Sequence, residues 1–498
     1  MNSSDEKFGA INLLEQRFDV TRWRCGDIDL WPLFRFRLYI DAMSRTFQNA
    51  PRRGLRERVA QLGNRAARAL WRVPLAAWRD NGNNAAIVPN TTAVFFSDGM
   101  SFTRLGDAWF DRVMDPLIIG LERRGHRSLK LTPLAEAHVP RHLPSRFVQP
   151  AIDRIKLTAS PSRVVVDLPE FDALHRAAVE KFGDCLPSYD WLRLQAARMT
   201  KLAAYFEAIL RETGARHAFV NTYYSIEGQS FVVAARRVGG RSIDVQHGIQ
   251  GPQHIAYGRW SAVPARGYST VPDEFWVWGA DEAATIEAWR NGCATHVPRM
   301  TGNYWQQRWR DDGDPWVQHY LEQARALRDV RPEVAHVLVC LTSGVPESET
   351  IKQIEAAKLC GESIRWWWRL HPQHAHQSAE FADTIARQGL DASQVEQATH
   401  LPFYALLRVA DLTVAHSSTT LREAAEFGVS SVVTSNYGVE LHADLVERGM
   451  VVPATEPRSI ADAVLSLLAR KQRGGSAVER SHDLLADVLD GDFGAAAA

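Results

Sequence analysis

The chain has few cysteines and no long apolar run. Its five cysteines are spread over 498 residues without a CxxC pair, which argues against a zinc ribbon, a redox pair or a disulfide framework and favours a reducing compartment. The first residues lack the basic start and apolar core of a signal peptide, and no stretch reaches the roughly 18 apolar residues of a membrane span. We therefore expect a cytoplasmic protein whose membrane contacts, if it makes any, are peripheral.

The chain also lacks an excess of charge of either sign. Lys+Arg and Asp+Glu both number 58, so no overall field draws the protein to nucleic acid. With 45% hydrophobic and 23% charged residues, the composition is that of a globular protein and excludes a disordered or fibrous chain. A chain of this length exceeds what one hydrophobic core supports, so two domains are expected.

Short β-rich runs alternate with helical stretches along most of the chain, which predicts an α/β fold with two parallel sheets flanked by helices. The runs lie at 92–97, 163–168, 217–221, 242–246, 274–279, 336–342, 364–370, 411–416 and 430–435. We expect two Rossmann-like domains in tandem. The predicted segments are a helical N-terminal extension at 1–90, a first domain at 91–305, a second domain at 306–475 and a C-terminal helix and tail at 476–498.

The segment 411–435 reads as a buried strand, a hydroxyl-rich turn, a short helix and another strand. The turn carries His416, Ser417, Ser418 and Thr419. Free backbone N–H groups at a helix start attract an anion, and open α/β sheets bind ligands beyond the carboxyl ends of their strands. We predict a nucleotide-phosphate site here. Helix capping is the alternative, because Thr420 and Glu423 have the spacing of a capping box.

A second polar group follows the run at 364–370. Arg369 and His371 lie two residues apart, so in a strand they would share a face. A guanidinium fork and an imidazole suit a phosphate, although a structural ion pair and a buried histidine would explain them equally. His374 and His376 invite a metal interpretation, but no nearby Cys or carboxylate completes a set with standard spacing. We expect no metal.

Three further candidates follow the run at 242–246, where a glycine-broken turn carries Gln246, His247 and Gly248. A histidine titrates near neutral pH and could act as a base or hold an anion. A structural role for a lone histidine is the alternative. Gln246 and Gly248 are expected on the acceptor side of the site.

Two carboxylates are placed to act as a general base, the group that removes the proton of an attacking hydroxyl. Asp98 in FFSDGM and Glu227 in YYSIEGQS each follow a β-rich run or turn and precede a glycine. Either carboxylate could instead cap the helix that follows it.

Together the segments after 364 resemble the C-terminal half of GT-B glycosyltransferases, in particular bacterial sialyltransferases and the Kdo transferases of capsule and lipopolysaccharide synthesis. The HP motif of these families looks like His371 and Pro372, and their paired hydroxyls look like Ser417 and Ser418. The resemblance implies that His371 and the two serines hold the donor phosphate, and that Glu423 reaches the ribose.

The first half of the chain carries further motifs of the same kind. The QHG at 246–248 resembles the first domain of capsule-type Kdo transferases, and the acidic-Gly motif of sialyltransferases looks like Asp98 and Gly99. That motif normally has two adjacent acidic residues, and here Ser97 precedes Asp98. The likeness covers roughly residues 90–470.

The resemblance implies a metal-independent glycosyltransferase without a cofactor, which moves a sugar from a nucleotide donor, such as CMP-Kdo or a related CMP-ulosonic acid, to a growing surface glycan. The alternatives are a CDP-polyol phosphotransferase and a non-catalytic glycan- or nucleotide-binding scaffold. An amphipathic basic helix is predicted at 52–80. It could lie on an anionic membrane near a lipid-linked glycan acceptor, or pack on the protein's own core.

Overall fold

The computed structural model describes residues 4–47, 85–133, 139–183, 186–290, 292–471 and 484–494. The chain divides into two compact units, of which unit 1 comprises Met1–Tyr304 and Asp483–Ala498 and unit 2 comprises Trp305–His482. The amphipathic helix predicted at 52–80 lies outside the described residues. In the part of the chain that is described, no helix is long and apolar enough to cross a membrane.

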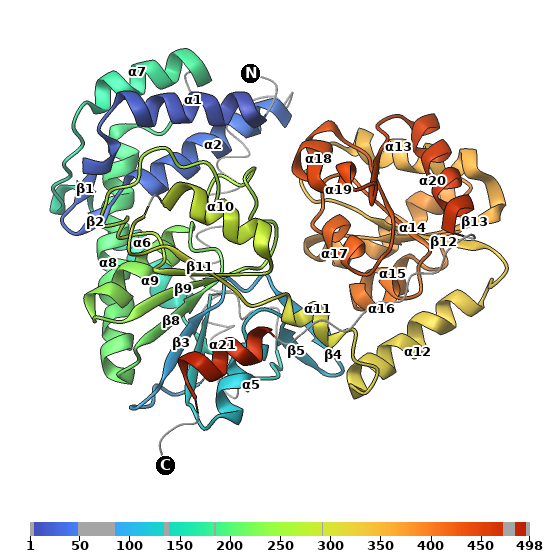
Figure 1. Ribbon diagram of the computed structural model, residues 1–498, viewed down its shortest axis with the longest axis horizontal. Helices are drawn as coiled ribbons and strands as arrows, with labels where there is room; N and C mark the ends of the chain where they lie inside the picture. Colours follow the sequence, from blue (N-terminus) through green and yellow to red (C-terminus); the bar gives the residue numbers. More distant parts are fainter. Residues whose placement is uncertain are drawn as a thin grey trace. The chain divides into compact units, whose positions relative to one another are not determined.

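Unit 1 is built on a seven-stranded parallel sheet of order β11-β10-β9-β8-β3-β6-β7 (Figure 1). Its strands are β3 (Ala93–Phe96), β6 (Ser128–Thr132), β7 (Arg146–Phe147), β8 (His217–Val220), β9 (Arg241–Val245), β10 (Glu274–Val277) and β11 (Val297–Met300). Two small hairpins accompany the sheet, β1 (Arg24–Cys25) with β2 (Ile28–Asp29) and β4 (Phe102–Leu105) with β5 (Ala108–Asp111).

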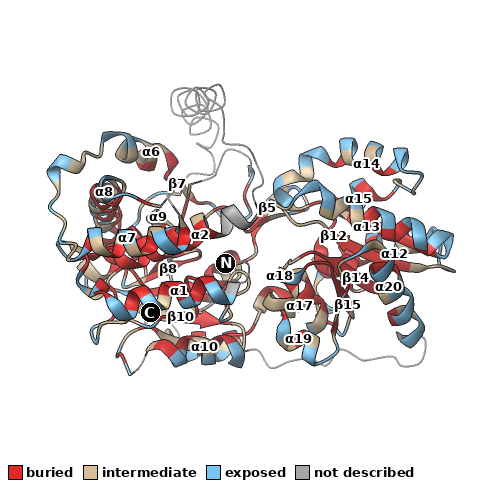
Figure 2. Cartoon of the chain, turned by 90° about the horizontal axis from the view of Figure 1, so that it is seen from above, coloured by how far each residue is buried: buried red, intermediate tan, exposed pale blue. Residues whose placement is uncertain are grey.

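Both faces of this sheet are buried, which explains why its strands read as continuous apolar runs. Ala93 and Phe95 of β3 join one apolar cluster, and Val94 and Phe96 join another on the opposite face, as the two-residue period of a strand requires. Figure 2 shows the strands as buried and the covering helices with one buried and one exposed side.

The helices of unit 1 are α1 (Ser4–Arg17), α2 (Trp31–Phe47), α5 (Asp115–Arg123), α6 (Gln149–Thr158), α7 (Phe171–Phe182), α8 (Tyr189–Thr213), α9 (Ile226–Arg237), α10 (Ala280–Arg290) and α21 (Leu484–Asp492). The N-terminal helices α1 and α2 contribute to the same apolar cluster as α8 and α9. The C-terminal helix α21 packs beside α5 (Figure 1), with Leu485 and Leu489 in the cluster on the other face.

The strand predicted at 163–168 is wrong. The structure has a 3₁₀ turn at Pro161–Arg163, followed by an extended segment that forms an isolated bridge between Arg24 and Asp167. Val165 is 88% exposed. The valines resemble a buried strand in composition, but no neighbouring strand among the described residues pairs with them.

Unit 2 contains a five-stranded parallel sheet of order β13-β12-β14-β15-β16. Its strands are β12 (Ala335–Cys340), β13 (Ile364–Arg369), β14 (Leu412–Ala415), β15 (Ser431–Val433) and β16 (Val451–Pro453). Its helices are α12 (Pro315–Asp329), α13 (Glu347–Cys360), α14 (Ser378–Arg387), α15 (Val395–His400), α16 (Phe403–Leu407), α17 (Thr420–Glu426), α18 (Asn436–Leu441), α19 (Ala443–Glu447) and α20 (Pro457–Lys471), with α11 (Tyr304–Arg308) at the junction with unit 1. The prediction of two Rossmann-like α/β units is therefore confirmed.

Candidate functional site

Each sheet reverses its strand order once, and polar side chains gather at both reversals. In unit 1 the chain runs from β3 outward to β6 and β7 and then returns to β8 on the other side of β3. In unit 2 it runs from β12 to β13 and then returns to β14. Ligands of open α/β sheets bind beyond the carboxyl ends of the strands at such reversals. The residues after β3 and β8 therefore define a candidate site in unit 1, and those after β12 and β14 define a second candidate site in unit 2.

At the reversal in unit 1, Asp98 and Asn221 bind each other. The Asp98 backbone N–H donates to the Asn221 amide oxygen at 2.9 Å, and the Asn221 amide nitrogen donates to Asp98 Oδ1 at 3.0 Å. Met100 N–H donates to the same Asp98 oxygen at 2.9 Å. The tight turn requires Gly99, whose φ is +78°, a value that a residue with a side chain rarely adopts. The half-buried carboxylate is thus held in one orientation.

Burial sets the electrostatics of this edge. It raises the pKa of Asp98 to about 6, the hydrogen bond from Met100 opposes the shift, and the negative charge of Asp111 adds to it. Burial also raises the pKa of Asp244, in β9, to about 8. Asp244 accepts hydrogen bonds from Tyr257 at 3.0 Å, Gln250 at 3.2 Å and a backbone N–H at 3.3 Å. Asp98 is thus ionised at neutral pH but remains basic enough to take a proton.

His247 lies at the end of the neighbouring strand β9. Its Nε2 is 3.4 Å from the Tyr224 hydroxyl. Burial lowers the pKa of His247 to about 4, and the positive charge of Arg112 adds to this effect. The imidazole is consequently neutral at pH 7, which suits a hydrogen-bonding role better than that of a proton acceptor.

The other two residues predicted in the QHG turn hold the backbone together. The Gln246 amide nitrogen donates to the Gly248 carbonyl at 2.8 Å, and its amide oxygen accepts from Trp278 N–H at 2.6 Å. Gln246 is only 1% exposed. It therefore anchors the turn to the segment after β10.

Glu227 lies in the first turn of α9. Within the described residues, its carboxylate forms no hydrogen bond with Asp98 or Asn221. The helix is capped by Ser225, whose hydroxyl accepts from Gly228 N–H at 2.9 Å. The Glu227 carboxylate forms an ion pair with Lys156 of α6. This ion pair gives the carboxylate a structural partner within unit 1.

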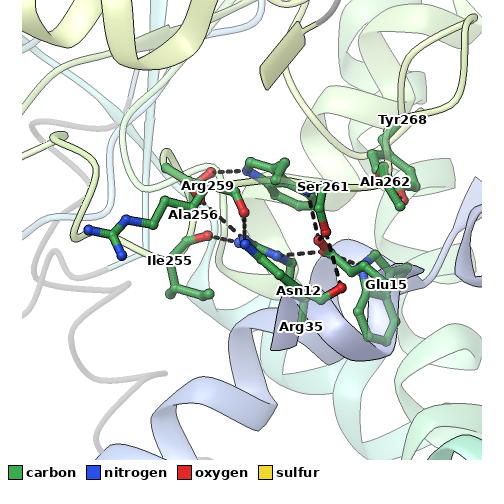
Figure 3. A network of polar contacts seen from close by, with 12 residues as sticks. Asn12, Glu15, Arg35, Ile255, Ala256, Arg259, Ser261, Ala262 and Tyr268 are labelled. Atoms are coloured by element: carbon green, nitrogen blue, oxygen red, sulfur yellow. Dashed lines mark hydrogen bonds and ion pairs between the residues drawn. The ribbon is translucent and has the colours of Figure 1, made fainter. Parts of the chain in front are cut away.

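The loop that follows His247 is secured by a buried ion pair from the N-terminal helices (Figure 3). Arg35 of α2 donates to Glu15 of α1 at 2.8 Å and to the carbonyls of Gly258 and Arg259 at 3.2 and 3.0 Å. Glu15 also accepts from the Ser261 N–H and hydroxyl, at 2.8 and 2.6 Å. Neither charged side chain reaches solvent. Helices α1 and α2 thus fix the loop that carries Tyr257.

In unit 2 the predicted hydroxyl turn follows β14 at the reversal. His416 Nδ1 and the Ser417 hydroxyl are 2.9 Å apart, and the Ser418 hydroxyl accepts from Thr420 N–H at 3.3 Å. Within the described chain, the backbone N–H groups of 417–419 donate to no backbone or side-chain acceptor. The turn therefore offers three N–H donors and the Ser417 and Ser418 hydroxyls to a ligand.

The back of this turn is closed by α18. The Ser435 hydroxyl donates to the His416 carbonyl at 2.7 Å and accepts from Gly438 N–H at 2.9 Å. A Cβ at Gly438 would come within 2.2 Å of the His416 carbonyl oxygen. His442 is fully buried beside the backbone of Ser418, and burial lowers its pKa to about 4. Only glycine at position 438 permits the close approach of α18 to the His416 carbonyl.

Glu423 is part of α17, whose N-cap Thr419 makes no side-chain capping bond. Because Thr420 is the first residue of the helix and not its N-cap, Thr420 and Glu423 do not form the capping box considered above. The Glu423 carboxylate instead accepts a hydrogen bond from the Tyr404 hydroxyl at 2.5 Å.

Arg369 and His371 have different surroundings. Arg369 ends β13, and its guanidinium donates to the carbonyls of Ala398 and Leu401, both at 2.6 Å. His371 caps the 3₁₀ turn Pro372–Gln377 and accepts from Gln373 N–H at 3.3 Å. A single strand face does not present both side chains, because His371 lies beyond the end of the strand.

Sequence reasoning did not single out several residues of the unit 1 edge, namely Arg112, Asn221, Tyr224 and Asp244. Asn221 ends the run HAFVN, so its position after a predicted strand could have identified it. Arg112 and Asp244 carry no such signal. Their relation to Asp98 depends on which strands become neighbours.

The chain matches no protein-family model and no curated protein. Among solved structures it is similar to UDP-GlcNAc 2-epimerase from Neisseria meningitidis bound to UDP-GlcNAc, with 11% identity, a TM-score of 0.47 and coverage of 80% of this chain and 98% of that one. It is also similar to the wall teichoic acid polymerase TagF with CDPG, with 11% identity, a TM-score of 0.44 and coverage of 88% and 97%. At these values we base the fold on the strand orders above and assign no activity from the likeness.

Proposed function

We propose that the protein is a glycosyltransferase that moves a sugar from a nucleotide-activated donor to a hydroxyl of a surface glycan. The observation that carries the proposal is the turn at 416–419, which presents unused backbone N–H groups and hydroxyls at the strand reversal of unit 2. A cluster of N–H donors suits the oxygens of a nucleotide phosphate. The motif resemblance adds a CMP-activated ulosonic acid such as Kdo as the specific donor to test first.

Asp98 supplies the chemistry on the acceptor side in this proposal. As the acceptor oxygen bonds to the anomeric carbon, its proton passes to the Asp98 carboxylate, and the bond from that carbon to the phosphate oxygen breaks. A base with a pKa of about 6 is ionised at neutral pH and still accepts a proton. Glu227 is the less suitable base, because Lys156 already occupies its carboxylate.

The phosphate that leaves gains negative charge, and the N–H groups of 417–419 would stabilise it. Preorganised donors of this kind favour the transition state over the ground state. In this account Ser417 and Ser418 add hydroxyl donors, and His416 orients the Ser417 hydroxyl, from which it lies 2.9 Å away.

Calorimetric titration with CMP, UDP, GDP and CDP tests the donor half. We expect one nucleotide to bind and its affinity to fall about tenfold or more in Ser418→Ala, because a hydrogen bond to a charged group contributes about 1.5–3 kcal/mol. Ser430→Ala is the matched control. Ser430 precedes β15 and so lies at the amino ends of the parallel strands, whereas the turn at 416–419 lies at their carboxyl ends. His371→Ala examines the role implied by the HP motif.

The outcomes separate the alternatives. A preference for UDP or GDP changes the donor and keeps the enzyme class. Product that retains a phosphate from a CDP-polyol identifies a phosphotransferase. Failure of the wild-type protein to bind any of the four nucleotides overturns the proposal and favours a glycan-binding scaffold.

A further inference from the structure

A short series of polar contacts in unit 2 joins helix α13 to the turn at 416–419. The Glu349 carboxylate of α13 lies 3.9 Å from His416 Nε2, and His416 Nδ1 lies 2.9 Å from the Ser417 hydroxyl. One ring nitrogen of His416 therefore faces a carboxylate, and the other faces a hydroxyl of the proposed phosphate site. We refer to Glu349, His416 and Ser417 as the Glu–His–Ser array.

The array is partly shielded from water and keeps a negative charge beside the imidazole. The side chains of His416 and Glu349 are 7% and 19% exposed. Glu349 also pairs with Lys352 at 3.4 Å, and the same Lys352 ammonium pairs with Glu456 at 3.5 Å. Because two carboxylates share one ammonium, Lys352 leaves part of the Glu349 charge available to a second cation.

The carboxylate also determines which nitrogen of the neutral imidazole carries the proton. Burial lowers the pKa of His416, the charge of Glu349 opposes this shift, and Lys352 adds to it, so the ring is neutral at pH 7. An ionised carboxylate only accepts hydrogen bonds, which favours the ring proton on Nε2. Nδ1 is then an acceptor, and in the free protein the Ser417 hydroxyl donates to it.

A bound phosphate requires the opposite arrangement of protons. Its oxygens accept hydrogen bonds, and the single hydroxyl proton of Ser417 cannot serve the phosphate and His416 together. A second proton on His416 removes the conflict, because Nδ1–H then donates to the Ser417 oxygen. The Glu349 carboxylate and the anion both favour the charged ring.

We propose that anion binding at the turn 417–419 is coupled to the uptake of one proton by His416, with Glu349 as the positioning residue that supplies the opposite charge. The proton comes from solvent, His416 donates to the Ser417 oxygen, and the Ser417 hydroxyl donates to the anion. The inference rests on the proposed function for the place of the phosphate. Backbone N–H groups do not titrate, so the array adds to an affinity that persists at high pH.

The other charged groups beside the turn are accounted for as follows. Burial lowers the pKa of His442 to about 4, which keeps it neutral above about pH 6. Arg422 of α17 and Asp444 of α19 form an ion pair at 2.8 Å, and neither type of group titrates near neutral pH. Histidines elsewhere in the chain remain in a His416→Gln variant, so its difference from wild type isolates His416.

Inorganic sulfate is the probe, because it keeps its charge across the neutral range, whereas a phosphate group titrates at about pH 6. Sulfate affinity is measured between about pH 6 and 8.5 at constant ionic strength. The His416 ring is followed by NMR with histidine labelled at Cε1, and its signal is assigned by its absence in His416→Gln. We expect sulfate to raise the pKa of His416 and the affinity to fall about tenfold as the pH rises, because a charge-assisted hydrogen bond is lost.

Variants of α13 test the part played by Glu349. Glu349→Gln keeps the size of the side chain without its charge, and we expect a lower pKa of His416 and an affinity that no longer depends on pH. Glu349→Asp keeps the charge and should restore part of the pH dependence. Glu355→Gln is the matched control, since Glu355 is an exposed carboxylate on the same helix, and should behave as wild type.

A sulfate affinity that is independent of pH, a His416 signal that sulfate leaves unchanged, or equal behaviour of Glu349→Gln and Glu355→Gln would overturn the coupling. Nucleotide binding and sugar transfer without a change at His416 removes the coupling and leaves the proposed function. Sulfate binding linked to protonation of His416, in a protein that binds no nucleotide and transfers no sugar, does the reverse.

Discussion

The two strand reversals differ in the chemical groups that they present. At the reversal of unit 1, the sheet edge presents side chains: a carboxylate held by Asn221, a neutral imidazole and a second buried carboxyl group at Asp244. At the reversal of unit 2, the edge presents backbone N–H groups and hydroxyls at 417–419. In the proposed function, the edge in unit 1 exchanges a proton and the edge in unit 2 holds an anion.

Burial explains the difference. A carboxylate becomes a useful base when desolvation raises its pKa, and Asp98 has been moved to about 6 in this way. Phosphate binding needs no titratable group, because backbone N–H donors keep their character at every pH. We therefore expect the basicity of Asp98 in unit 1 to depend on the packing around its carboxylate. The proposed phosphate binding in unit 2 should depend on the shape of one turn.

The largest effect is expected when the base of unit 1 is removed alone. Asp98→Asn should lower kcat by about 10²–10⁴, the usual contribution of a general base, while nucleotide affinity in unit 2 stays unchanged. Wild-type kcat/KM should fall as the pH drops below about 6, because the carboxylate takes up a proton there. Steady-state kinetics and calorimetry on the same preparations measure both quantities.

Asp107→Asn is the matched control, since Asp107 is exposed in the turn between β4 and β5. An Asp98→Asn variant with wild-type kcat would remove the base from the proposal. A parallel loss of nucleotide affinity would show that the two units do not divide the work as described.

The packing of unit 1 can be broken without touching the edge itself. Arg35→Met should lower the free energy of unfolding of unit 1 by about 3–5 kcal/mol, because it leaves a buried Glu15 without its cation. Arg37→Met is the control on the same helix, where an exposed pair with Asp41 contributes at most about 0.5 kcal/mol. Denaturant unfolding monitored by tryptophan fluorescence measures both, and equal effects of the two variants would contradict the role given to the buried pair.

The two units also differ in how much of each could be predicted from sequence. Strands buried on both faces were visible as apolar runs, as at β3, β8, β12 and β14. The runs at 128–132 and 297–300 were missed, since Lys130 and Arg299 interrupt their apolar character. The hydroxyl turn of unit 2 is continuous in sequence, so local reading places all of its residues together.

The unit 1 edge is discontinuous, and this limits prediction. Asp98 and Asn221 are 123 residues apart, and only the return of β8 to the side of β3 brings them together. The position of Arg112 depends on the hairpin before it. The raised pKa of Asp244 depends on its burial by several elements. Sequence patterns report local periodicity and give no information on which strands become neighbours.

The shape of the turn in unit 2 can be tested through its closest backbone contact. Gly438→Ala places a methyl group where 2.2 Å separates the Cβ position from the His416 carbonyl oxygen, so the turn must shift. We expect a loss of about 1–3 kcal/mol in the unfolding free energy of unit 2, as for other overpacked sites, and a weaker nucleotide affinity.

Gly313→Ala is the control in the same unit, because the nearest atom to its Cβ is the flexible Asp311 carboxylate at 3.2 Å. Unfolding curves and nucleotide titrations of the two variants provide the comparison. A Gly438→Ala protein with unchanged affinity would show that nucleotide binding does not depend on the shape of this turn.

The smallest effect concerns the pH dependence of unit 1 stability. The pKa of Asp244 is raised from 3.8 to about 8 in the folded state, so the native protein binds more protons than the unfolded chain between these values. The free energy of unfolding therefore falls as pH rises, with a slope of at most about 1.4 kcal/mol per pH unit for one proton. Asp244→Asn should flatten the curve between about pH 6.5 and 7.5, a window above the pKa of Asp98. The loss of hydrogen bonds to Tyr257 and Gln250 shifts the whole curve, so only its slope reports the titration of Asp244. Parallel curves for wild type and variant would show that another group takes up the proton.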